Sequence, residues 1–333
     1  MMSTTPVLEV RNLVKHFPIT SRGVLFSKEV GVVHAVDGVS FSVNKGETFG
    51  LVGESGCGKT TTARSIMYLD APTSGEILFE GTEISSVFKS KDKEAILHLR
   101  QKIQYVFQNP YASLDPRMTV ADIIMEPLVI HGHIPKDKWH DRLYELLQLV
   151  GLEEYHAERY PHEFSGGQRQ RICIARALAV EPDLLIADEP VASLDVSVRA
   201  QILNLMRELQ QKFKITYLYI SHDLSTVRHI CHRVAVMYLG KFVEIAETDD
   251  LFERPLHPYT QALLSSIPIP DPDAKTKRIM LPGEVPSPIN PPLGCRFEPR
   301  CIFNKNHVCV HDAPGLVDVG GGHFVACGGL PRR

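Results

Sequence analysis

The segment that most constrains the fold is GESGCGKT, at Gly53–Thr60. It follows an apolar run that ends at Val52 and precedes TTTARSIMYL, a run with helical character. The pattern G-x-x-x-x-G-K-S/T between a strand and a helix is typical of a loop whose backbone N–H groups surround a phosphate chain. The N-terminus of the following helix adds positive potential for the same phosphates. In this setting, a glycine-rich turn that matches by chance is the weaker alternative.

Two side chains of this loop would carry chemistry. Lys59 places a positive charge at the β- and γ-phosphates of a nucleotide, and the Thr60 hydroxyl can ligate Mg²⁺. Cys57 lies at a variable position of the loop, and its thiol is given no chemical role. The residues expected to contact the nucleotide are Gly53, Ser55, Gly56, Cys57, Gly58, Lys59, Thr60 and Thr61.

A second segment, DLLIADEP at Asp183–Pro190, reads as an apolar strand that ends in two acids. Asp188, at the carboxyl end of the strand, could hold Mg²⁺ opposite Thr60. Glu189 could then polarise the attacking water. Without the upstream loop, acids that cap a helix would explain this pair equally well. With the loop, the functional interpretation is favoured.

Composition narrows the class of protein. The chain has 333 residues, 44% of them apolar, which is enough for a sizeable core, and a formal net charge of −3, which gives no global indication of nucleic-acid binding. No apolar run approaches the length of a membrane helix, and the N-terminus does not resemble a secretory signal. We therefore expect a cytosolic chain with reduced thiols.

The hydrophobic pattern predicts an α/β fold. PVLEVRNLVKHF and VVHAVDGVSFSVNKGETFGLVG alternate like strands of a mostly antiparallel sheet that ends in a buried strand at 48–52, with an extended hairpin or loop between them. Residues 110–165 have helical spacing. From 183 onward strands and helices alternate, which is typical of a parallel sheet. From about residue 253 the chain is proline-rich, and we expect an irregular tail with one short helix.

A third segment, FSGGQRQR at Phe164–Arg171, precedes the helical pattern ICIARALAV. It resembles LSGGQ, the signature of ATP-binding cassette (ABC) ATPases, with Phe164 in place of leucine. The resemblance implies an ABC-type P-loop ATPase core with an antiparallel β subdomain and an α-helical subdomain. In that family two subunits pack head to tail, and each ATP lies between one chain's phosphate loop and the other chain's signature. The signature residues here are Ser165, Gly166, Gly167 and Gln168.

Further family elements follow in order along the chain. Gln108 in VFQNP resembles the glutamine that contacts Mg²⁺, so the resemblance implies Mg²⁺ ligation by Thr60, Gln108 and Asp188. Asp195 in ASLD resembles the loop that contacts the opposite subunit. His222 in ISHD resembles the histidine that binds the γ-phosphate and acts with Glu189. For the aromatic ring against adenine, the matching residue is Phe17, with His16 as the alternative.

The tail narrows the resemblance. HPYTQALLSSIPIPDP and GEVPSPINPPLGCRFEPRC resemble the C-terminal extension of ATPase subunits of oligopeptide, dipeptide and nickel importers, and most closely the second ATPase subunit of dipeptide permeases. We therefore predict a cassette at 6–252, with its helical subdomain at about 110–165, and a Pro/Cys-rich extension at 253–333.

The resemblance implies that the chain hydrolyses ATP to energise import of dipeptides or oligopeptides from a peripheral position on the cytoplasmic face of the membrane. Its partners would be a second ATPase, favoured as a paralogue, two integral membrane permease subunits and an extracytoplasmic peptide-binding protein. Nickel chelates and haem remain alternative cargoes.

Two rival classes are a cassette ATPase that acts on nucleic acid or ribosomes and a subunit that binds ATP without hydrolysing it. The single cassette, without heptads or a basic stripe, disfavours the first, and Glu189 with His222 disfavours the second.

Four of the seven cysteines lie in the tail with the spacing C-x₅-C-x₇-C-x₁₇-C. Four thiolates suit either Zn²⁺ or an iron–sulfur cluster, although the paired C-x₂-C usual for zinc is absent. A disulfide knot is disfavoured in a reducing compartment, and four unliganded thiols remain an alternative. Similar tails in peptide-importer ATPases carry a [4Fe–4S] cluster, so the resemblance favours that cofactor over zinc. The expected ligands are Cys295, Cys301, Cys309 and Cys327; Cys57, Cys173 and Cys231 are interpreted as structural.

Overall fold

The structure is a computed structural model that describes residues 6–22, 27–132, 134–267, 278–303, 309 and 314–329. Its internal contacts divide the chain into two compact units. The first unit comprises Met1–Leu8, Val43–Thr48 and Phe79–Ile220, and the second comprises Glu9–Ser42, Phe49–Leu78 and Ser221–Arg333.

The first unit is built on three parallel strands. β7 (Leu184–Asp188) lies between β6 (Ile103–Val106) and β8 (Thr216–Ser221), with Leu184 opposite both Ile103 and Thr216. Every residue of β7 and β8 is buried, as expected for parallel strands covered on both faces. The predicted alternation of strands and helices is confirmed here, since α8 (Val196–Phe213) connects β7 to β8.

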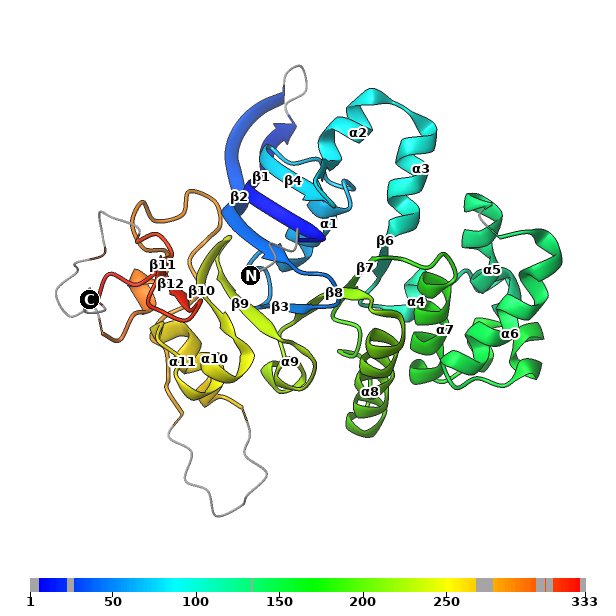
Figure 1. Cartoon of the computed structure of the whole chain (residues 1–333). Helices are drawn as coiled ribbons and strands as arrows, with labels where there is room; N and C mark the ends of the chain where they lie inside the picture. Colours follow the sequence, from blue (N-terminus) through cyan, green and yellow to red (C-terminus); the bar gives the residue numbers. More distant parts are fainter. Residues whose placement is uncertain are drawn as a thin grey trace, which may run out of the picture. The chain divides into compact units, whose positions relative to one another are not determined.

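Helices make up most of the rest of the first unit. α5 (Val120–His131), α6 (Trp139–Leu149) and α7 (Gly166–Leu178) pack against one another, which confirms the helical character predicted near 110–165 (Figure 1). Thr119 caps α5 in a capping box with Asp122, and Gly132 ends the helix in the left-handed conformation. The remaining elements are β5 (Thr82–Glu83), α2 (Ile84–Ser90), α3 (Lys93–Lys102), α4 (Pro110–Ser113) and the 3₁₀ turns η1 (Lys136–Lys138), η2 (Glu154–Glu158) and η3 (Pro161–Glu163).

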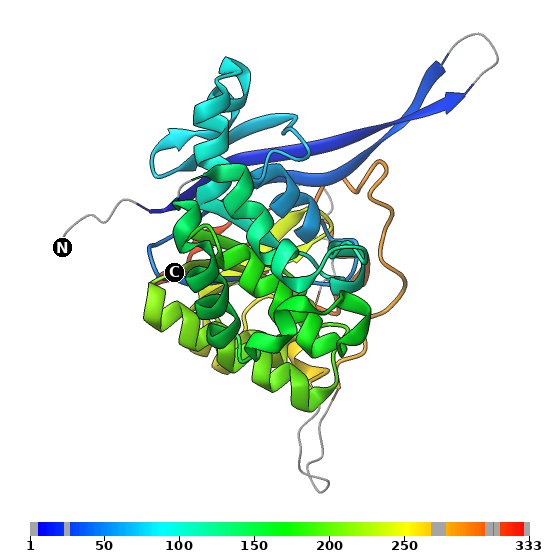
Figure 2. The same cartoon turned by 90° about the vertical axis from the view of Figure 1, so that its right-hand side faces the viewer.

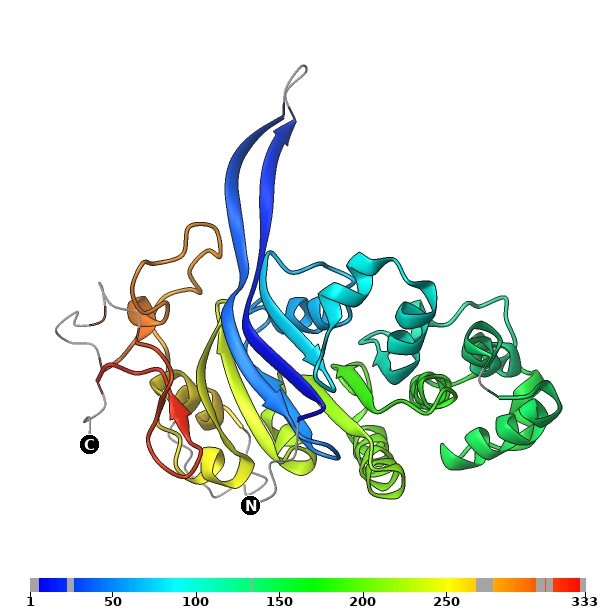
Figure 3. The ribbon, with the colours of Figure 1, turned by 45° about the horizontal axis from the view of Figure 1, so that its top comes forward.

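The second unit contains the predicted antiparallel hairpin. β1 (Leu8–Arg22) and β2 (Ser27–Val43) run side by side as a long twisted ribbon (Figures 2 and 3), and β4 (Ser74–Phe79) lies on the other side of β1. The tip of the hairpin, residues 23–26, lies outside the described residues. The long extended run in the sequence is therefore one ribbon rather than a loop between two short strands.

A second sheet of this unit corrects one expectation. β3 (Thr48–Val52) does not end the antiparallel sheet but pairs in parallel with β9 (Arg233–Tyr238). The physical reason is burial. Every residue of β3 is buried, and strands that are buried on both faces are typical of a parallel sheet. β10 (Lys241–Glu247) then pairs antiparallel with β9 (Figure 1).

The tail is more regular than its composition predicts. β12 (Phe324–Val325) pairs antiparallel with β10, and β11 (Val317–Asp318) pairs with β12. The expected short helix is α11 (Pro258–Ser265), which follows α10 (Thr248–Glu253). The other elements of this unit are α1 (Lys59–Ile66), α9 (Leu224–Ile230) and the 3₁₀ turn η4 (Glu298–Arg300). Within the described ranges, no helix has the length and apolar character needed to cross a membrane.

Candidate functional site

The phosphate loop lies in the second unit, between β3 and α1. Gly58 occupies the N-cap position of α1 with a φ of 111°, and a Cβ at this position would lie 2.2 Å from the Ala35 carbonyl oxygen. A Cβ at Gly53 would lie 2.1 Å from the Met237 carbonyl oxygen. Both positions therefore require glycine, because neighbouring backbone leaves no room for a side chain.

Lys59 is folded back over this loop. Its side chain is buried, and Nζ donates to the carbonyl oxygens of Gly53 at 2.8 Å and Glu54 at 3.1 Å. Ser55, Gly56 and Thr60 are exposed, whereas Cys57 is buried, and its burial raises the pKa of the thiol. The loop thus exposes several of its residues, while its own carbonyl oxygens hold the lysine. Thr61, already inside α1, is half-buried.

The aromatic residue expected against adenine lies on β1. Phe17 is half-buried, with the ammonium group of Lys15 4.7 Å from the centre of its ring. His16, the alternative, is engaged elsewhere: its Nε2 is 3.2 Å from Asp37 Oδ1, and its ring lies against the His34 ring, with centroids 4.1 Å apart and the planes tilted by 48°. Burial would raise the pKa of Asp37, but the Arg296 charge and hydrogen bonds from the two histidines outweigh it and lower that pKa. This arrangement favours Phe17 for the adenine contact.

In the first unit, the acidic pair stands at the carboxyl end of β7. Asp188 is 4% exposed, and its Oδ2 accepts a hydrogen bond of 2.7 Å from the Tyr105 hydroxyl. Glu189 adopts a left-handed φ of 48°, and its carboxylate accepts 2.8 Å from Gln108 Nε2. Three residues predicted as functional, Gln108, Asp188 and Glu189, are therefore brought together at one edge of the sheet.

The signature segment forms the start of α7. Ser165 is the N-cap, its Oγ accepts from the Gln168 N–H, and the Gln168 side chain accepts from the Ser165 N–H. This capping box leaves Ser165 exposed. Gly167 is required by packing, because a Cβ there would lie 2.3 Å from Val198 on α8. Phe164, the departure from leucine, is only 4% exposed, so an apolar side chain of either type can fill this position.

Two further predicted residues occupy turns. Asp195 precedes α8 with its side chain exposed, and the adjacent Val196 is 80% exposed, so this segment is free to meet another protein surface. His222 follows β8 and is also exposed. Asp223 caps α9 through the Ser225 N–H at 2.9 Å and thereby orders the turn on one side of His222.

The four cysteines of the extension line one small cavity in the second unit, together with His257 and Phe297. Burial raises the pKa of the Cys295 thiol to about 11, and the neighbouring Cys309 and Cys301 contribute to the rise. A bound cation would relieve this cost by stabilising the thiolates. The residue types and their arrangement therefore fit a metal group.

The residue types that line this cavity suit more than one metal group. Four thiolates can hold either a tetrahedral zinc ion or an iron–sulfur cluster. Among the described residues, no three cysteine sulfur atoms lie within 4.8 Å of one another.

An open groove lies on the helical part of the first unit. It has a volume of about 690 Å³ and is lined mainly by α5 and α6, including Met125, Val129, Ile130 and Trp139. Val129 and Ile130 are more than half exposed. A groove with exposed apolar side chains is typical of a surface that a partner covers.

Some residues around these sites were not predicted from the sequence. Tyr105 donates a hydrogen bond to Asp188. The only feature of the sequence that could have identified Tyr105 is its position in the short strand before Gln108. Arg300 and Tyr259 contact Glu54 of the phosphate loop, and no local pattern predicts contacts between residues so far apart in the chain.

Solved structures support the fold. The chain resembles the ATP-binding cassette MJ0796 in a dimeric post-hydrolysis state bound to ADP and Pi, with a TM-score of 0.62 and 28% identity over 72% of this chain and 98% of that one. It also resembles CbiO1 from Clostridium perfringens, part of an ABC transporter complex, with a TM-score of 0.62 and 28% identity over 75% of this chain and 91% of that one. The predicted ABC-type α/β fold is thereby confirmed.

Relatives cover the chain almost completely. It is 54% identical to the oligopeptide transport ATP-binding protein AppF of Bacillus subtilis, over 96% of each chain, and 49% identical to the dipeptide transport ATP-binding protein DppF of Escherichia coli, over 97% of this chain and 94% of that one. Residues 36–192 match the ABC transporter family, and residues 243–309 match the C-terminal region of oligopeptide/dipeptide transporters. The chain therefore belongs to the ABC transporter ATPases, in the group that carries the oligopeptide/dipeptide C-terminal region.

Proposed function

We propose that this chain is the ATP-hydrolysing subunit of an importer that takes up dipeptides or oligopeptides. The observation that carries the proposal is the contact between Gln108 and Glu189 beside the buried Asp188, because in a chain of this family these side chains would be a Mg²⁺ ligand, the base and a second Mg²⁺ ligand. A subunit that only binds ATP would not need an ordered base at this position.

The proposed reaction is hydrolysis of the β–γ bond of ATP. Phosphoryl transfer depends mainly on positioning and on neutralising charge. Lys59 and the N–H groups of the loop would bind the phosphates, and Phe17 would stack on adenine. Mg²⁺, held by Thr60, Gln108 and Asp188, would neutralise charge on the β- and γ-phosphates when bound.

Glu189 would orient the attacking water and accept its proton, since its carboxylate is already held by Gln108. His222 would hydrogen-bond the γ-phosphate. A second subunit would add the start of its own α7, at Ser165–Gln168, and contacts around Asp195 on each chain would join the two subunits. Hydrolysis would then release the pair.

We also propose the partners and the place of the chain. The second ATPase would be a paralogue, and two integral membrane permease subunits would each insert an apolar segment into a groove like that between α5 and α6. A peptide-binding protein outside the membrane would deliver the cargo. The chain would be peripheral, on the cytoplasmic face, with the cassette at 6–252 and the extension at 253–333.

Uptake of labelled peptide tests this function. A strain without the gene should lose uptake of a labelled dipeptide or oligopeptide, and the wild-type gene should restore it. Lys59→Ala should fail to restore uptake, because it removes a charge that binds ATP, whereas Lys45→Ala, at an exposed turn, should restore it. Parallel assays with nickel and haem test the alternative cargoes; normal peptide uptake without the gene would refute the proposal.

For the extension, we propose a structural [4Fe–4S] cluster on Cys295, Cys301, Cys309 and Cys327, supported by the cavity that these four cysteines share. Protein purified without oxygen should be brown, absorb near ~400 nm and hold about four iron atoms per chain. Cys301→Ser should lose this colour, whereas Cys231→Ser, at a buried cysteine elsewhere, should keep it. One zinc per colourless chain would refute the iron assignment.

A further inference from the structure

Glu54, the second residue of the phosphate loop, is held from two sides by the extension. Its backbone N–H donates to the Tyr259 hydroxyl oxygen at 2.9 Å, and its carboxylate accepts from Arg300 Nη1 at 3.0 Å. Tyr259 is the second residue of α11 and Arg300 is the last residue of η4. The carbonyl oxygen of Glu54 in turn accepts from Lys59 Nζ at 3.1 Å. One residue thus connects the phosphate-binding lysine to the extension.

Both partners of Glu54 are built into the interior of the unit. Tyr259 is fully buried and its ring packs against Tyr238, with centroids 4.7 Å apart, and against Phe297 at 5.5 Å. Burial raises the pKa of Tyr259, which keeps its hydroxyl neutral. Arg300 is 8% exposed and lies over the Tyr238 ring at 6.0 Å. Neither side chain is free to follow a moving loop, so each fixes Glu54 in place.

A second arginine fixes the other side of the loop. Arg296 donates to the Leu239 carbonyl oxygen at 2.5 Å and also pairs with Asp37. In the same turn, the Gly240 N–H donates to the Cys57 carbonyl oxygen at 2.8 Å. The segment around Arg296 therefore supports the turn that holds Cys57, one residue before the helix-capping Gly58.

The two arginines flank two of the cysteines. Arg296 follows Cys295 and Arg300 precedes Cys301, while Phe297 and Glu298 between them line the cysteine cavity. Any group that ties Cys295 to Cys301 also sets the positions of both arginines. The cysteine cavity and the phosphate loop are thus connected through one segment of seven residues, 295–301.

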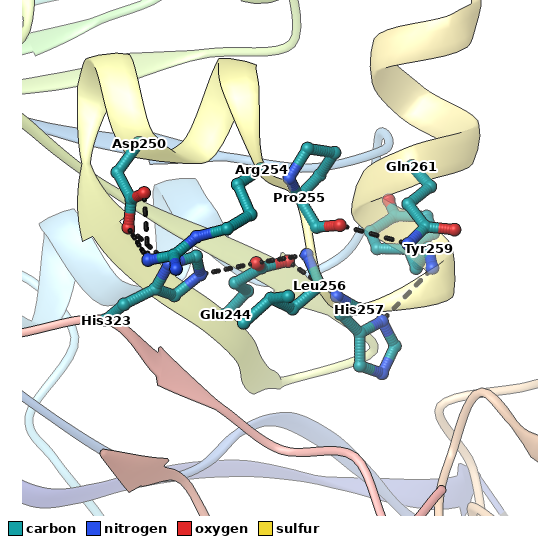
Figure 4. A network of polar contacts seen from close by, with 9 residues as sticks. All are labelled: Glu244, Asp250, Arg254, Pro255, Leu256, His257, Tyr259, Gln261 and His323. Atoms are coloured by element: carbon teal, nitrogen blue, oxygen red, sulfur yellow. Dashed lines mark hydrogen bonds and ion pairs between the residues drawn. The ribbon is translucent and has the colours of Figure 1, made fainter. Parts of the chain in front are cut away.

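Tyr259 is anchored to the same region from the other direction (Figure 4). His257 Nδ1 accepts from the Tyr259 N–H at 3.1 Å, and the His257 N–H donates to Glu244 at 2.9 Å. His323, on the strand side of the extension, contacts Glu244 through Nε2 at 2.7 Å. His257 also lines the cysteine cavity. The start of α11 is therefore fixed by buried polar contacts, which places the Tyr259 hydroxyl at the loop.

From these contacts we infer that the extension positions the phosphate loop: Arg300 and Tyr259 hold Glu54 in the conformation that receives the nucleotide. An intact cysteine cluster keeps segment 295–301 in place, so loss of the cluster would lower the affinity for nucleotide. The inference rests on nucleotide binding at Gly53–Thr60 and, for the coupling, on the proposed cluster. Its physical basis is charge. Glu54 is an acid within a loop that binds anionic phosphates, and Arg300 neutralises it.

A double-mutant cycle tests the pairing. The dissociation constant of a fluorescent ADP analogue would be measured on the full-length chain for Arg300→Gln, Glu54→Gln and the double variant. Arg300→Gln should raise it by about ten-fold, because it leaves an unpaired carboxylate beside the phosphates. Glu54→Gln should have a much smaller effect, and the double variant should match Glu54→Gln, since the repelling charge is gone. Added salt should reduce the effect of Arg300→Gln.

Matched controls separate positioning from stability. Arg254→Gln removes an exposed arginine of the same extension, and Tyr217→Phe removes a buried hydroxyl that donates to Met206 in the other unit. Both should leave nucleotide affinity unchanged, whereas Tyr259→Phe should weaken it several-fold. Arg300→Lys, which retains the charge, should recover part of the affinity. If Arg300→Gln folds, by thermal melting, and binds the analogue like the wild type, the inference is wrong.

The coupling has its own test. Cys301→Ser, or removal of the metal with a chelator, should weaken binding of the analogue in the wild-type background and have no further effect in Arg300→Gln. An equal loss in both backgrounds would overturn the coupling through Arg300. Lys59→Ala separates failure of this inference from failure of the proposed function. If Lys59→Ala binds the analogue as tightly as the wild type does, nucleotide binding at this loop is refuted, and not only the positioning role.

Discussion

At the scale of single residues, the backbone of Glu189 is unusual. A φ of 48° is uncommon for a residue with a side chain, and the Glu189 N–H donates to the Ile220 carbonyl oxygen at 2.9 Å. This turn leads the chain away from β7 immediately after Asp188, so that the two neighbouring carboxylates have different partners, Tyr105 and Gln108. Left-handed residues of this kind are often associated with functional sites.

Glu189→Gln should slow ATP hydrolysis at least ~10²-fold while leaving ATP binding intact, because the amide cannot accept a proton. The new amide has the same shape and can still accept from Gln108, so the local structure should be kept. The expected consequence is an ATP-bound closed dimer, which single-turnover hydrolysis and size-exclusion chromatography would detect.

Glu208→Gln, an exposed position on α8, is the matched control and should hydrolyse ATP at the wild-type rate. Near-normal turnover by Glu189→Gln in the reconstituted complex would contradict the assignment of the base.

At the scale of elements, β12 is too short to be held by its strand pairing alone. His323, which precedes it, is buried between two acids: Nε2 lies 2.7 Å from Glu244 on β10, and Nδ1 lies 2.6 Å from Asp250 on α10 (Figure 4). Arg254 shares Asp250 with His323. With an acceptor at each nitrogen, the ring is best satisfied as the imidazolium. The ion pairs thus attach the end of the extension to a strand and a helix.

His323→Gln should therefore destabilise the second unit by about 2–3 kcal/mol at pH 6, because it removes a buried charge from between two acids. Burial opposes the charge, but the hydrogen bonds to Glu244 and Asp250 outweigh it and raise the pKa of His323. A raised pKa gives stability that is full below the unfolded pKa of about 6.5 and is lost as pH rises through the folded pKa.

Thermal unfolding of the wild type and of His323→Gln between pH 6 and pH 9 measures this. The difference in melting temperature should shrink as pH rises. His140→Gln, on the exposed surface of α6, should show no such difference. If the difference in melting temperature between the wild type and His323→Gln stayed constant over this pH range, it would contradict an ionised His323.

At the scale of the whole molecule, we propose that the chain contributes one half to each of two nucleotide sites. In the family, ATP is bound by the phosphate loop of one subunit and the signature of another, and a relative of this chain is a dimer with ADP and Pi. The exposed Ser165, Asp195 and Val196 are consistent with a surface that a second subunit covers.

Activity should therefore depend on partners. The purified chain should hydrolyse ATP poorly as a monomer, and specific activity should rise when the second ATPase and the permease subunits are added. Ser165→Arg should suppress hydrolysis in the complex without weakening nucleotide binding by the isolated chain, whereas Ser90→Arg, on an exposed end of α2, should do neither. Full activity that is independent of concentration in a monomeric preparation would refute this.

Local motifs were predictable because contiguous residues determine them. The loop at Gly53–Thr60 needs only a strand, three glycines and a helix start, and the capping box at Ser165–Gln168 is complete within four residues. The helical spacing near 110–165 and the apolar strand before Asp188 were readable for the same reason. The sequence also indicated the family, since several such motifs occur in the expected order.

Other features depended on contacts across the chain. The parallel pairing of β3 with β9 follows from burial on both faces, and a strand pattern alone does not state its partner. The hydrogen bond from Tyr105 to Asp188 joins residues 83 positions apart, and that from Arg300 to Glu54 joins residues 246 positions apart. No local sequence pattern predicts either contact. The sequence by itself thus determined which loop and which side chains are proposed to bind phosphate. The tertiary structure decided what holds them, because long-range contacts form only when distant segments share one buried interior.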